Sequence, residues 1–484
     1  MSEAASTAPA GSARGFFRSV GSLISARVFL VLAQFIALPV IARHLAVEDF
    51  AIMAMAMSVV IFGSMLSDAG LGQSLIRSKS EDPAEWSSAF WLLVAVGCGL
   101  AALIIAISPV WAWFFDTEEL IAVMAALSLI PLCQALAAAP NAEMERREQY
   151  STIAAIQMVT TVASVGLGIG LALAGFGVWA LVAQQVALAA VRLAGVALLT
   201  RFRPRFYFSL GLLGEHLRFA RDAIAVSGIT AIQNQSTVIV IGRLLGEGPL
   251  GLFAMNQRFV NLPKSGLAGP VSSVVYVRMA KARDEPARVV DIYVAAIRLL
   301  SHVMFPVVAV IAAAGPAVFT VVLSEKWRDV ATIFAFSVPG MMFEAVTIMC
   351  LSALFRAMGR TELLLRFIAE GAVLRILIVL PAAFISLEAV AVSLTIWGVV
   401  FVLRGWVYAG RCVALDLGRC LGAVAVPAAV GAAFAALHML LLSSIEVGNL
   451  EEMAIAAIGA PLAVAVAALL NHRMIRHDIT RFRA

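Results

Sequence analysis

Six basic side chains lie within long apolar stretches of this 484-residue sequence, where an unpaired charge is costly. A Lys or Arg at the centre of a membrane-spanning helix costs about 2.5–3.5 kcal/mol on insertion scales, so six of them would cost roughly 15–20 kcal/mol if they faced lipid. We therefore expect these side chains to face protein or water. They are Arg27, Arg192, Arg258, Lys264, Arg298 and Arg375.

Few acidic residues occur in comparable positions, chiefly Asp68, Glu344 and Glu370. An interior built from these groups keeps an excess of positive charge, which suits an anion such as a diphosphate, because Arg offers a bidentate fork to phosphate oxygens. Arg258 and Lys264 have no acidic neighbour three or four positions away, which favours ligand contact. The other candidates, with interhelical ion pairing as the alternative, are Arg298, Arg27 and Arg375. Arg192, near a helix end, is interpreted as a snorkelling or ion-paired side chain.

Amides and hydroxyls recur at helical spacing beside these cations, as in the series Ser227, Thr230, Asn234 and Thr237. Such stripes would suit sugar hydroxyls in an aqueous cavity, and ordinary interhelical hydrogen bonding is the alternative. The amides expected to line the cavity are Asn234, Gln235, Gln257, Asn261 and Gln34. The third to sixth predicted spans are expected to face lipid or to pack within their own half.

The sequence contains no GxxxxGK[ST] phosphate loop, so we do not expect ATP hydrolysis. Transport would then draw on an ion gradient, the membrane potential or consumption of the delivered substrate. Asp68 and Glu344 are the candidate proton or sodium sites. The five cysteines form no CxxC pair or His/Cys ligand spacing, so no metal and no cofactor is expected.

The elements that must position these residues are membrane helices. The chain is 62% hydrophobic and 13% charged, whereas soluble domains are about 45–50% apolar and about 25% charged. One span needs roughly 20 apolar residues, and we expect about fourteen spans. The first six are expected at 20–42, 50–74, 88–114, 119–139, 152–174 and 177–200, the next six at 218–242, 249–277, 290–314, 331–355, 363–386 and 389–411, and a final pair at 421–442 and 452–472.

These spans predict six segments along the chain. They are a disordered tail at 1–16, a first six-helix lobe at 17–200, a basic linker at 201–217, a second lobe at 218–411, a helix pair at 412–473 and a tail at 474–484. About 25 of the basic residues fall on one side of the membrane, about four on the other and about six within spans. This asymmetry predicts a multi-pass protein of the inner membrane with both termini in the cytoplasm, and such dispersed charge argues against a nucleic-acid partner.

A weak internal repeat has an offset of 200 residues. The segments 41–55 and 241–255 match at five positions, which are Ile41/Ile241, Arg43/Arg243, Leu45/Leu245, Ala54/Ala254 and Met55/Met255. Both copies follow the first span of their six-helix set, so they would run in the same direction through the bilayer. Parallel repeats of this kind occur in transporters whose halves rock about a central site. Chance agreement between apolar segments is the alternative.

Five motifs resemble those of the polysaccharide transporter (oligosaccharide flippase) family of the multidrug/oligosaccharidyl-lipid/polysaccharide exporter superfamily. They lie at 41–50, 66–77, 241–252, 324–327 and 353–360, and the likeness covers roughly 20–410. The resemblance implies an all-α polytopic fold with two six-helix lobes in a pseudo-twofold V, followed here by a helix pair that matches no motif. It also implies export of undecaprenyl-diphosphate-linked oligosaccharides by alternating access.

The expected products of such a flippase are exopolysaccharide, capsule or O-antigen, assembled in the periplasm or at the outer leaflet. The expected partners are the lipid-linked substrate, membrane lipids, a polysaccharide polymerase and a chain-length regulator, with a monomer as the simplest assembly. A multidrug/cation antiporter of the same superfamily is the nearer alternative, although it would favour acidic cavity residues. A membrane glycosyltransferase or polysaccharide polymerase is the second alternative. Such an enzyme would need paired carboxylates or a His for acid/base catalysis, and the short predicted outer loops contain no carboxylates accompanied by a His, so we expect no enzyme.

Overall fold

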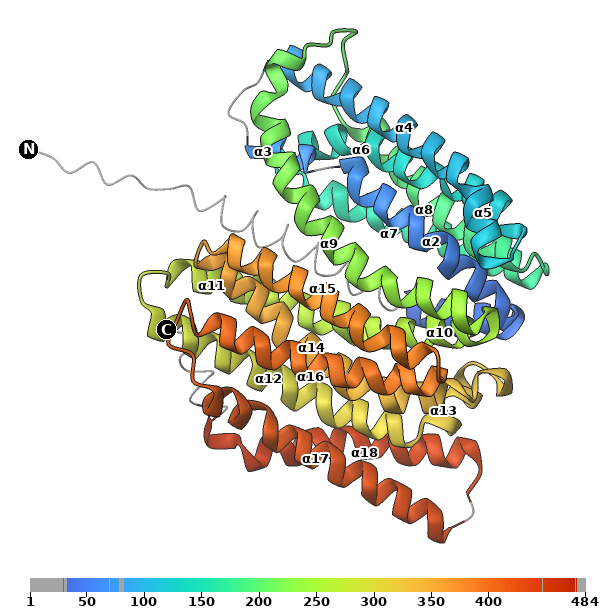
Figure 1. Ribbon diagram of the computed structural model, residues 1–484, viewed down its shortest axis with the longest axis vertical. Helices are drawn as coiled ribbons and strands as arrows, with labels where there is room; N and C mark the ends of the chain where they lie inside the picture. The colour runs from blue at the N-terminus through green and yellow to red at the C-terminus, as the bar shows by residue number, and fades with distance from the viewer. Residues whose placement is uncertain are drawn as a thin grey trace, which may run out of the picture. The chain divides into compact units, whose positions relative to one another are not determined.

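The computed structural model describes residue 29 and residues 33–68, 70–77, 82–445, 447–474 and 476. Within these ranges every regular element is a helix, which confirms the all-helical prediction (Figure 1). Arg27, the side chain of Asp68 and the predicted tail 1–16 lie outside the described residues, as does most of the tail 474–484.

The chain divides into two compact units. The first unit contains the residues up to Leu45 together with Met55–Gly228, and the second contains Ala46–Ala54 and the residues from Ile229 onward. The first crossing between the units falls in the turn before α2 (Val47–Asp68), and the other two fall inside α2 and α9 (Gly214–Leu245). At these two points the chain passes from one unit to the other within continuous helix.

The first unit is built from closely packed helices between α2 and α9. Asp82 caps α4 by accepting a hydrogen bond from Ala84 N, and Pro83 supplies a helical φ at the first position. Small residues allow close approach: a Cβ on Gly97 of α4 would lie 2.7 Å from Ala135 Cβ of α6. The helices are α3 (Leu71–Arg77), α4 (Pro83–Phe115), α5 (Glu119–Leu127), α6 (Leu129–Arg146), α7 (Tyr150–Leu173), α8 (Val178–Leu199) and the short 3-10 turn η1 (Leu210–Leu213).

The second unit places α14 and α16 in backbone contact, because a Cβ on Gly340 would lie 2.2 Å from Thr395 Cα. The final pair, α17 and α18, packs against α12 (Figure 1). The elements are α10 (Glu247–Pro263), the π turn η2 (Lys264–Ala268), α11 (Gly269–Lys281), α12 (Pro286–Ala313), α13 (Gly315–Val322), η3 (Glu325–Trp327), α14 (Val330–Ala357), α15 (Thr361–Ala383), α16 (Leu387–Ala409), α17 (Leu417–Ser444) and α18 (Asn449–Leu470).

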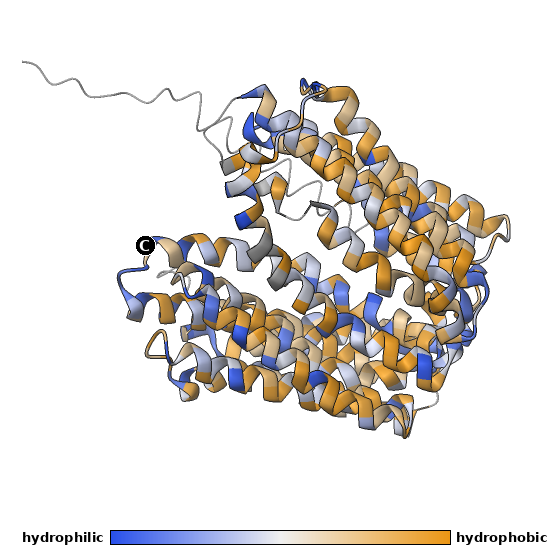
Figure 2. Ribbon diagram, turned by 45° about the horizontal axis from the view of Figure 1, so that its top comes forward, coloured by the Kyte–Doolittle hydropathy of each residue, from blue (hydrophilic) through white to orange (hydrophobic). Residues whose placement is uncertain are grey.

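Ten helices of the described residues are long and apolar enough to cross a membrane. Hydrophobic residues run along most helices, while many of the hydrophilic ones gather at their ends (Figure 2). The expected total of fourteen spans is not confirmed. The predicted span 249–277 is interrupted after Pro263, α15 carries four charged residues, and α9 begins with a polar stretch, while 20–42 falls largely outside the described residues.

The predicted repeat coincides with matching breaks in the helices. A helix over 33–44 ends just before α2 begins at Val47, and α9 ends at Leu245 just before α10 begins at Glu247. The second break uses Gly246, whose φ of 88° lies in the region that glycine favours. The two turns thus keep the offset of 200 residues found in the sequence.

Candidate substrate-binding site

The guanidinium of Arg258 on α10 lies over the ring of Phe50, 4.8 Å from its centroid. Phe50 belongs to the second unit and packs edge-on against Trp327 at 5.1 Å. Among the described residues, no carboxylate forms an ion pair with Arg258. Its charge is therefore held by an aromatic face, which leaves the guanidinium donors available for an anion.

Lys264 lies where the helix changes geometry. Pro263 closes α10, and the next five residues form a π turn that starts at Lys264 and leads into α11. Such π turns within helices frequently occur at functional sites. Lys264 Nζ lies 3.5 Å from Glu344 Oε1 on α14, so two residues that the sequence assigned to separate roles form one ion pair.

Arg375 on α15 is buried, with 3% of its surface exposed. Its Nε donates to Thr237 Oγ1 on α9 at 3.1 Å, and its guanidinium lies 4.6 Å from the centroid of Trp397 on α16. Glu344 stabilises the charge electrostatically without a direct ion pair. Arg375 thus joins α9, α15 and α16, and Glu344 serves two cations.

The remaining candidates differ in exposure. Asn234, Asn261 and Gln34 are exposed, whereas Gln235, Gln257 and Arg298 are half-buried. Asn256 is fully buried on α10 and donates to Ser337 Oγ at 2.9 Å. Asn256 directly precedes Gln257 in the sequence, but its burial depends on α14 and so leaves no signal in the sequence.

Glu370 has a local partner, as the spacing of four from Arg366 allowed. Arg366 Nε lies 3.4 Å from Glu370 Oε1, and Arg404 Nη2 pairs with Glu370 Oε2. Tyr408 also donates to Glu370 Oε1 at 2.6 Å. Glu370 therefore ties α15 to α16.

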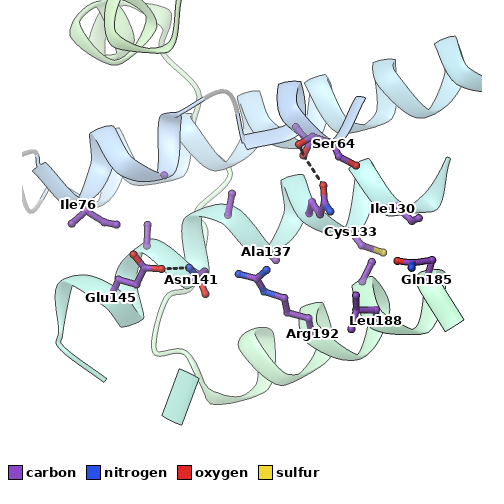
Figure 3. Close-up of a pocket in the computed structure, with 16 residues that line it drawn as sticks. Ser64, Ile76, Ile130, Cys133, Ala137, Asn141, Glu145, Gln185, Leu188 and Arg192 are labelled. Atoms are coloured by element: carbon purple, nitrogen blue, oxygen red, sulfur yellow. Dashed lines mark hydrogen bonds between the residues drawn. The ribbon is translucent and has the colours of Figure 1, made fainter. Parts of the chain in front are cut away.

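A polar pocket of about 350 Å³ lies within the first unit (Figure 3). Arg192 extends into it from α8, and Asn141 donates to Glu145 Oε1 at 2.6 Å on α6. Ser67 Oγ on α2 donates a hydrogen bond to Gln134 Oε1 on α6 at 3.2 Å. Other polar lining residues are Ser64 and Gln185.

This pocket adds two features that the sequence did not predict. The fourth and sixth predicted spans, expected to face lipid or to pack, contribute α6 and α8 to its wall. Arg192, interpreted as snorkelling or ion-paired, lines the pocket and forms no ion pair among the described residues. The sequence did contain a sign of this pocket. Gln185 and Arg192 are seven residues apart, as are Gln134 and Asn141, so each pair lies on one face of its helix.

The lining of the pocket suits a sugar ring. Amides, hydroxyls, a carboxylate and a guanidinium together supply donors and acceptors around one polar space. Binding sites of about this size usually fix a ligand with a few such groups.

A second cavity, of about 560 Å³, lies within the second unit among α12, α14, α16 and α17. Its wall is apolar apart from Thr395, with Phe305, Met342, Leu421 and several alanines along it. We call it the apolar groove. The sequence left open whether the final helix pair holds a polyprenyl chain or only widens one half of the protein.

The sequence of this chain is similar to those of proteins of bacterial polysaccharide biosynthesis. Residues 40–332 match the sequence profile of the family described as polysaccharide biosynthesis protein. The succinoglycan biosynthesis transport protein ExoT of Rhizobium meliloti (strain 1021) is 28% identical over 268 residues, covering 55% of this chain and 54% of the relative. The teichuronic acid biosynthesis protein TuaB of Bacillus subtilis (strain 168) is 24% identical over 272 residues, covering 55% of this chain and 56% of the relative.

A solved structure of the lipid II flippase MurJ in an inward closed conformation has the same fold. The TM-score is 0.76 at 13% sequence identity, and the match covers 95% of this chain and 100% of that chain. Together with the ten apolar helices, this likeness identifies a multi-pass membrane protein. The chain spans about half the length of the curated relatives it matches.

Proposed function

Because the chain belongs to the polysaccharide biosynthesis protein family, we propose that it moves a lipid-linked oligosaccharide across the membrane. The substrate class is an undecaprenyl-diphosphate oligosaccharide, carried from the cytoplasmic to the outer leaflet for assembly of a surface polysaccharide. Transport, not catalysis, is the activity of the chain. The named role of the relative ExoT in succinoglycan transport supports this proposal.

The half-buried guanidinium of Arg258, held over the ring of Phe50, is the observation that carries the proposal. A diphosphate entering a low-dielectric region needs compensating positive charge, and a cation without a carboxylate partner supplies it with the least competition. Lys264 adds a second cation, which Glu344 keeps compensated while no substrate is bound. Arg375 adds positive electrostatic potential from a fixed position, because its Nε is hydrogen-bonded to Thr237.

The two cavities fit the other parts of the same substrate. In the first unit, the polar pocket around Arg192 matches a sugar, because its groups can exchange hydrogen bonds with hydroxyls. In the second unit, the apolar groove matches a polyprenyl chain, which offers only hydrocarbon. The polar pocket is therefore the proposed site for a sugar, and the apolar groove is the proposed site for a lipid chain.

The proposed topology defines the two sides between which the substrate moves. The asymmetry of Lys and Arg supports an inner-membrane protein with cytoplasmic termini. A polymerase and a chain-length regulator would receive the product on the far side. Asp68 and Glu344 are the proposed sites of ion coupling, and a transport rate independent of proton and sodium gradients would remove that role.

Surface polysaccharide in cells tests the function. A strain lacking this chain is complemented with wild-type protein, Arg258→Gln, Lys264→Gln or the exposed control Arg283→Gln. We expect wild type and R283Q to restore polymer, whereas R258Q restores less than about a tenth at equal abundance in the membrane. Full polymer with R258Q would contradict the role of Arg258, and normal polymer without the chain would contradict the function.

A further inference from the structure

The segment between α8 and η1 is strapped to the first turns of α4 by three hydrogen bonds. Arg205 N donates to Ser87 Oγ at 3.0 Å, and Ser209 N donates to Ser88 Oγ at 3.0 Å. Trp91 Nε1 donates to Arg205 O at 2.8 Å. We call residues 201–209 the strap. Its backbone is held by side chains of α4, so it presents a fixed surface.

Aromatic packing holds the same segment from inside. Phe202 packs against Trp86 and Phe90, with ring centroids 6.1 and 5.8 Å apart. Phe206 stacks on Trp91 at 5.3 Å. Just beyond the strap, Leu213 is buried in a cluster that includes Trp86. Phe202 is therefore half-buried, whereas Phe206 remains almost fully exposed despite its contact with Trp91.

The exposed part of the strap combines aromatic rings with positive charge. Phe206 is 96% exposed, and Tyr207 and Phe208 are about half exposed. Arg201, Arg203 and Arg205 are exposed beside them, and the strap contains no acidic residue. Arg203 donates to the carbonyls of Thr200 and Phe202, so it is partly engaged. Arg218, near the start of α9, is also exposed.

The strap adjoins the ends of two candidate membrane spans. It begins directly after the candidate span Val178–Leu199, and it runs along the beginning of the candidate span Pro83–Phe115. A helix of 33 residues is about 50 Å long, while the hydrocarbon core is about 30 Å thick, so the ends of α4 reach the headgroup layer. Exposed aromatic rings and arginines concentrate in that layer.

We propose that the strap binds the headgroups of anionic phospholipids. The aromatic rings of Phe206, Tyr207 and Phe208 enter the interface, and the guanidinium groups of Arg201, Arg205 and Arg218 pair with lipid phosphates. The complementarity of charge selects an anionic lipid over a zwitterionic one. This surface is separate from the substrate-binding site, and its role does not depend on the proposed transport function.

Lipid titration of the purified full-length protein tests the proposal. Thermal stability in detergent is followed while phosphatidylglycerol or phosphatidylcholine is added, without oligosaccharide substrate. The test variant is R201Q/R205Q/R218Q, which keeps Arg203 for the backbone. The matched control R278Q/K281Q/R283Q removes three cations from the last turn of α11 and the turn that follows it, which offer no comparable run of exposed rings.

We expect phosphatidylglycerol to stabilise wild type and the control at similar concentrations, and the test variant to need at least tenfold more. Added salt should weaken the stabilisation of wild type by phosphatidylglycerol, because salt screens exposed charges. This measurement needs no variant. Equal responses of wild type to the two lipids would overturn the proposal. An unchanged response of the test variant would also overturn it, because the strap arginines would then not bind the lipid. An equal loss in the control would do the same, because the net positive charge of the protein would then explain the effect.

Discussion

Lys264 Nζ on the π turn lies 3.5 Å from Glu344 Oε1 on α14, which places a cation and its counterion where the α10–α11 helix is broken. Glu344 also acts electrostatically on the buried Arg375. One carboxylate thus compensates two cations of the second unit, while Arg258 on the same helix as Pro263 has an aromatic partner. A diphosphate that binds Lys264 would compete with Glu344.

Replacing Glu344 tests this balance of charge. Glu344→Gln leaves Lys264 and Arg375 without their carboxylate, so we expect a loss of roughly 1–3 kcal/mol in stability, below the full value for breaking a buried pair because Lys264 is partly exposed. Thermal unfolding in detergent measures the change. The control is Glu325→Gln in the exposed pair with Arg328, which should shift stability little. Equal stability of E344Q and wild type would show that Glu344 does not compensate the cations.

Filling the polar pocket of the first unit tests its role in sugar recognition. Ala189 lines the pocket on α8, so Ala189→Leu should lower the transport rate of the oligosaccharide substrate at least tenfold. The neighbouring Ala190→Leu places the same bulk on an exposed position of α8 outside the pocket lining. Initial transport rates of the two variants provide the comparison. Equal rates would mean that the pocket has no part in transport.

The contact between the two repeated turns offers a packing test. A Cβ on Gly251 of α10 would lie 2.2 Å from Val47 O at the start of α2, within the second unit. Gly251→Ala therefore forces the segments apart, at a cost of about 1–3 kcal/mol. Gly248→Ala meets no atom within 4 Å and is the matched control. Thermal unfolding that ranks G248A below G251A would contradict the packing.

The sequence predicted the parts of the fold that depend on local pattern. Long apolar runs located most spans, and the match between Leu45 and Leu245 located two equivalent turns. It could not show that Pro263 is followed by a π turn, because proline breaks a helix in several ways and the neighbouring α14 decides the geometry. The expected span 363–386 nearly coincides with α15, although its four charged residues keep it out of the ten apolar helices.

Side-chain partners from distant segments were beyond sequence analysis. The polar nature of Lys264 and Glu344 was evident, but 80 residues separate them and only packing brings them together. Arg192 was judged from its place near a helix end, whereas its pocket depends on α2 and α6. For Arg258, the absence of acidic neighbours in the sequence is matched in the fold, where no described carboxylate pairs with it, and its contact with a ligand stays a prediction.

Translocation in proteoliposomes tests the central claim most directly. Purified wild-type protein, Arg258→Gln and the control R283Q are reconstituted with a fluorescent undecaprenyl-diphosphate oligosaccharide, and the fraction reaching the opposite leaflet is followed by access to an impermeant sugar-modifying reagent. We predict rapid translocation with wild type and R283Q, and a rate with R258Q at least tenfold lower. A wild-type rate equal to that of protein-free liposomes, or an R258Q rate equal to wild type, would contradict the account.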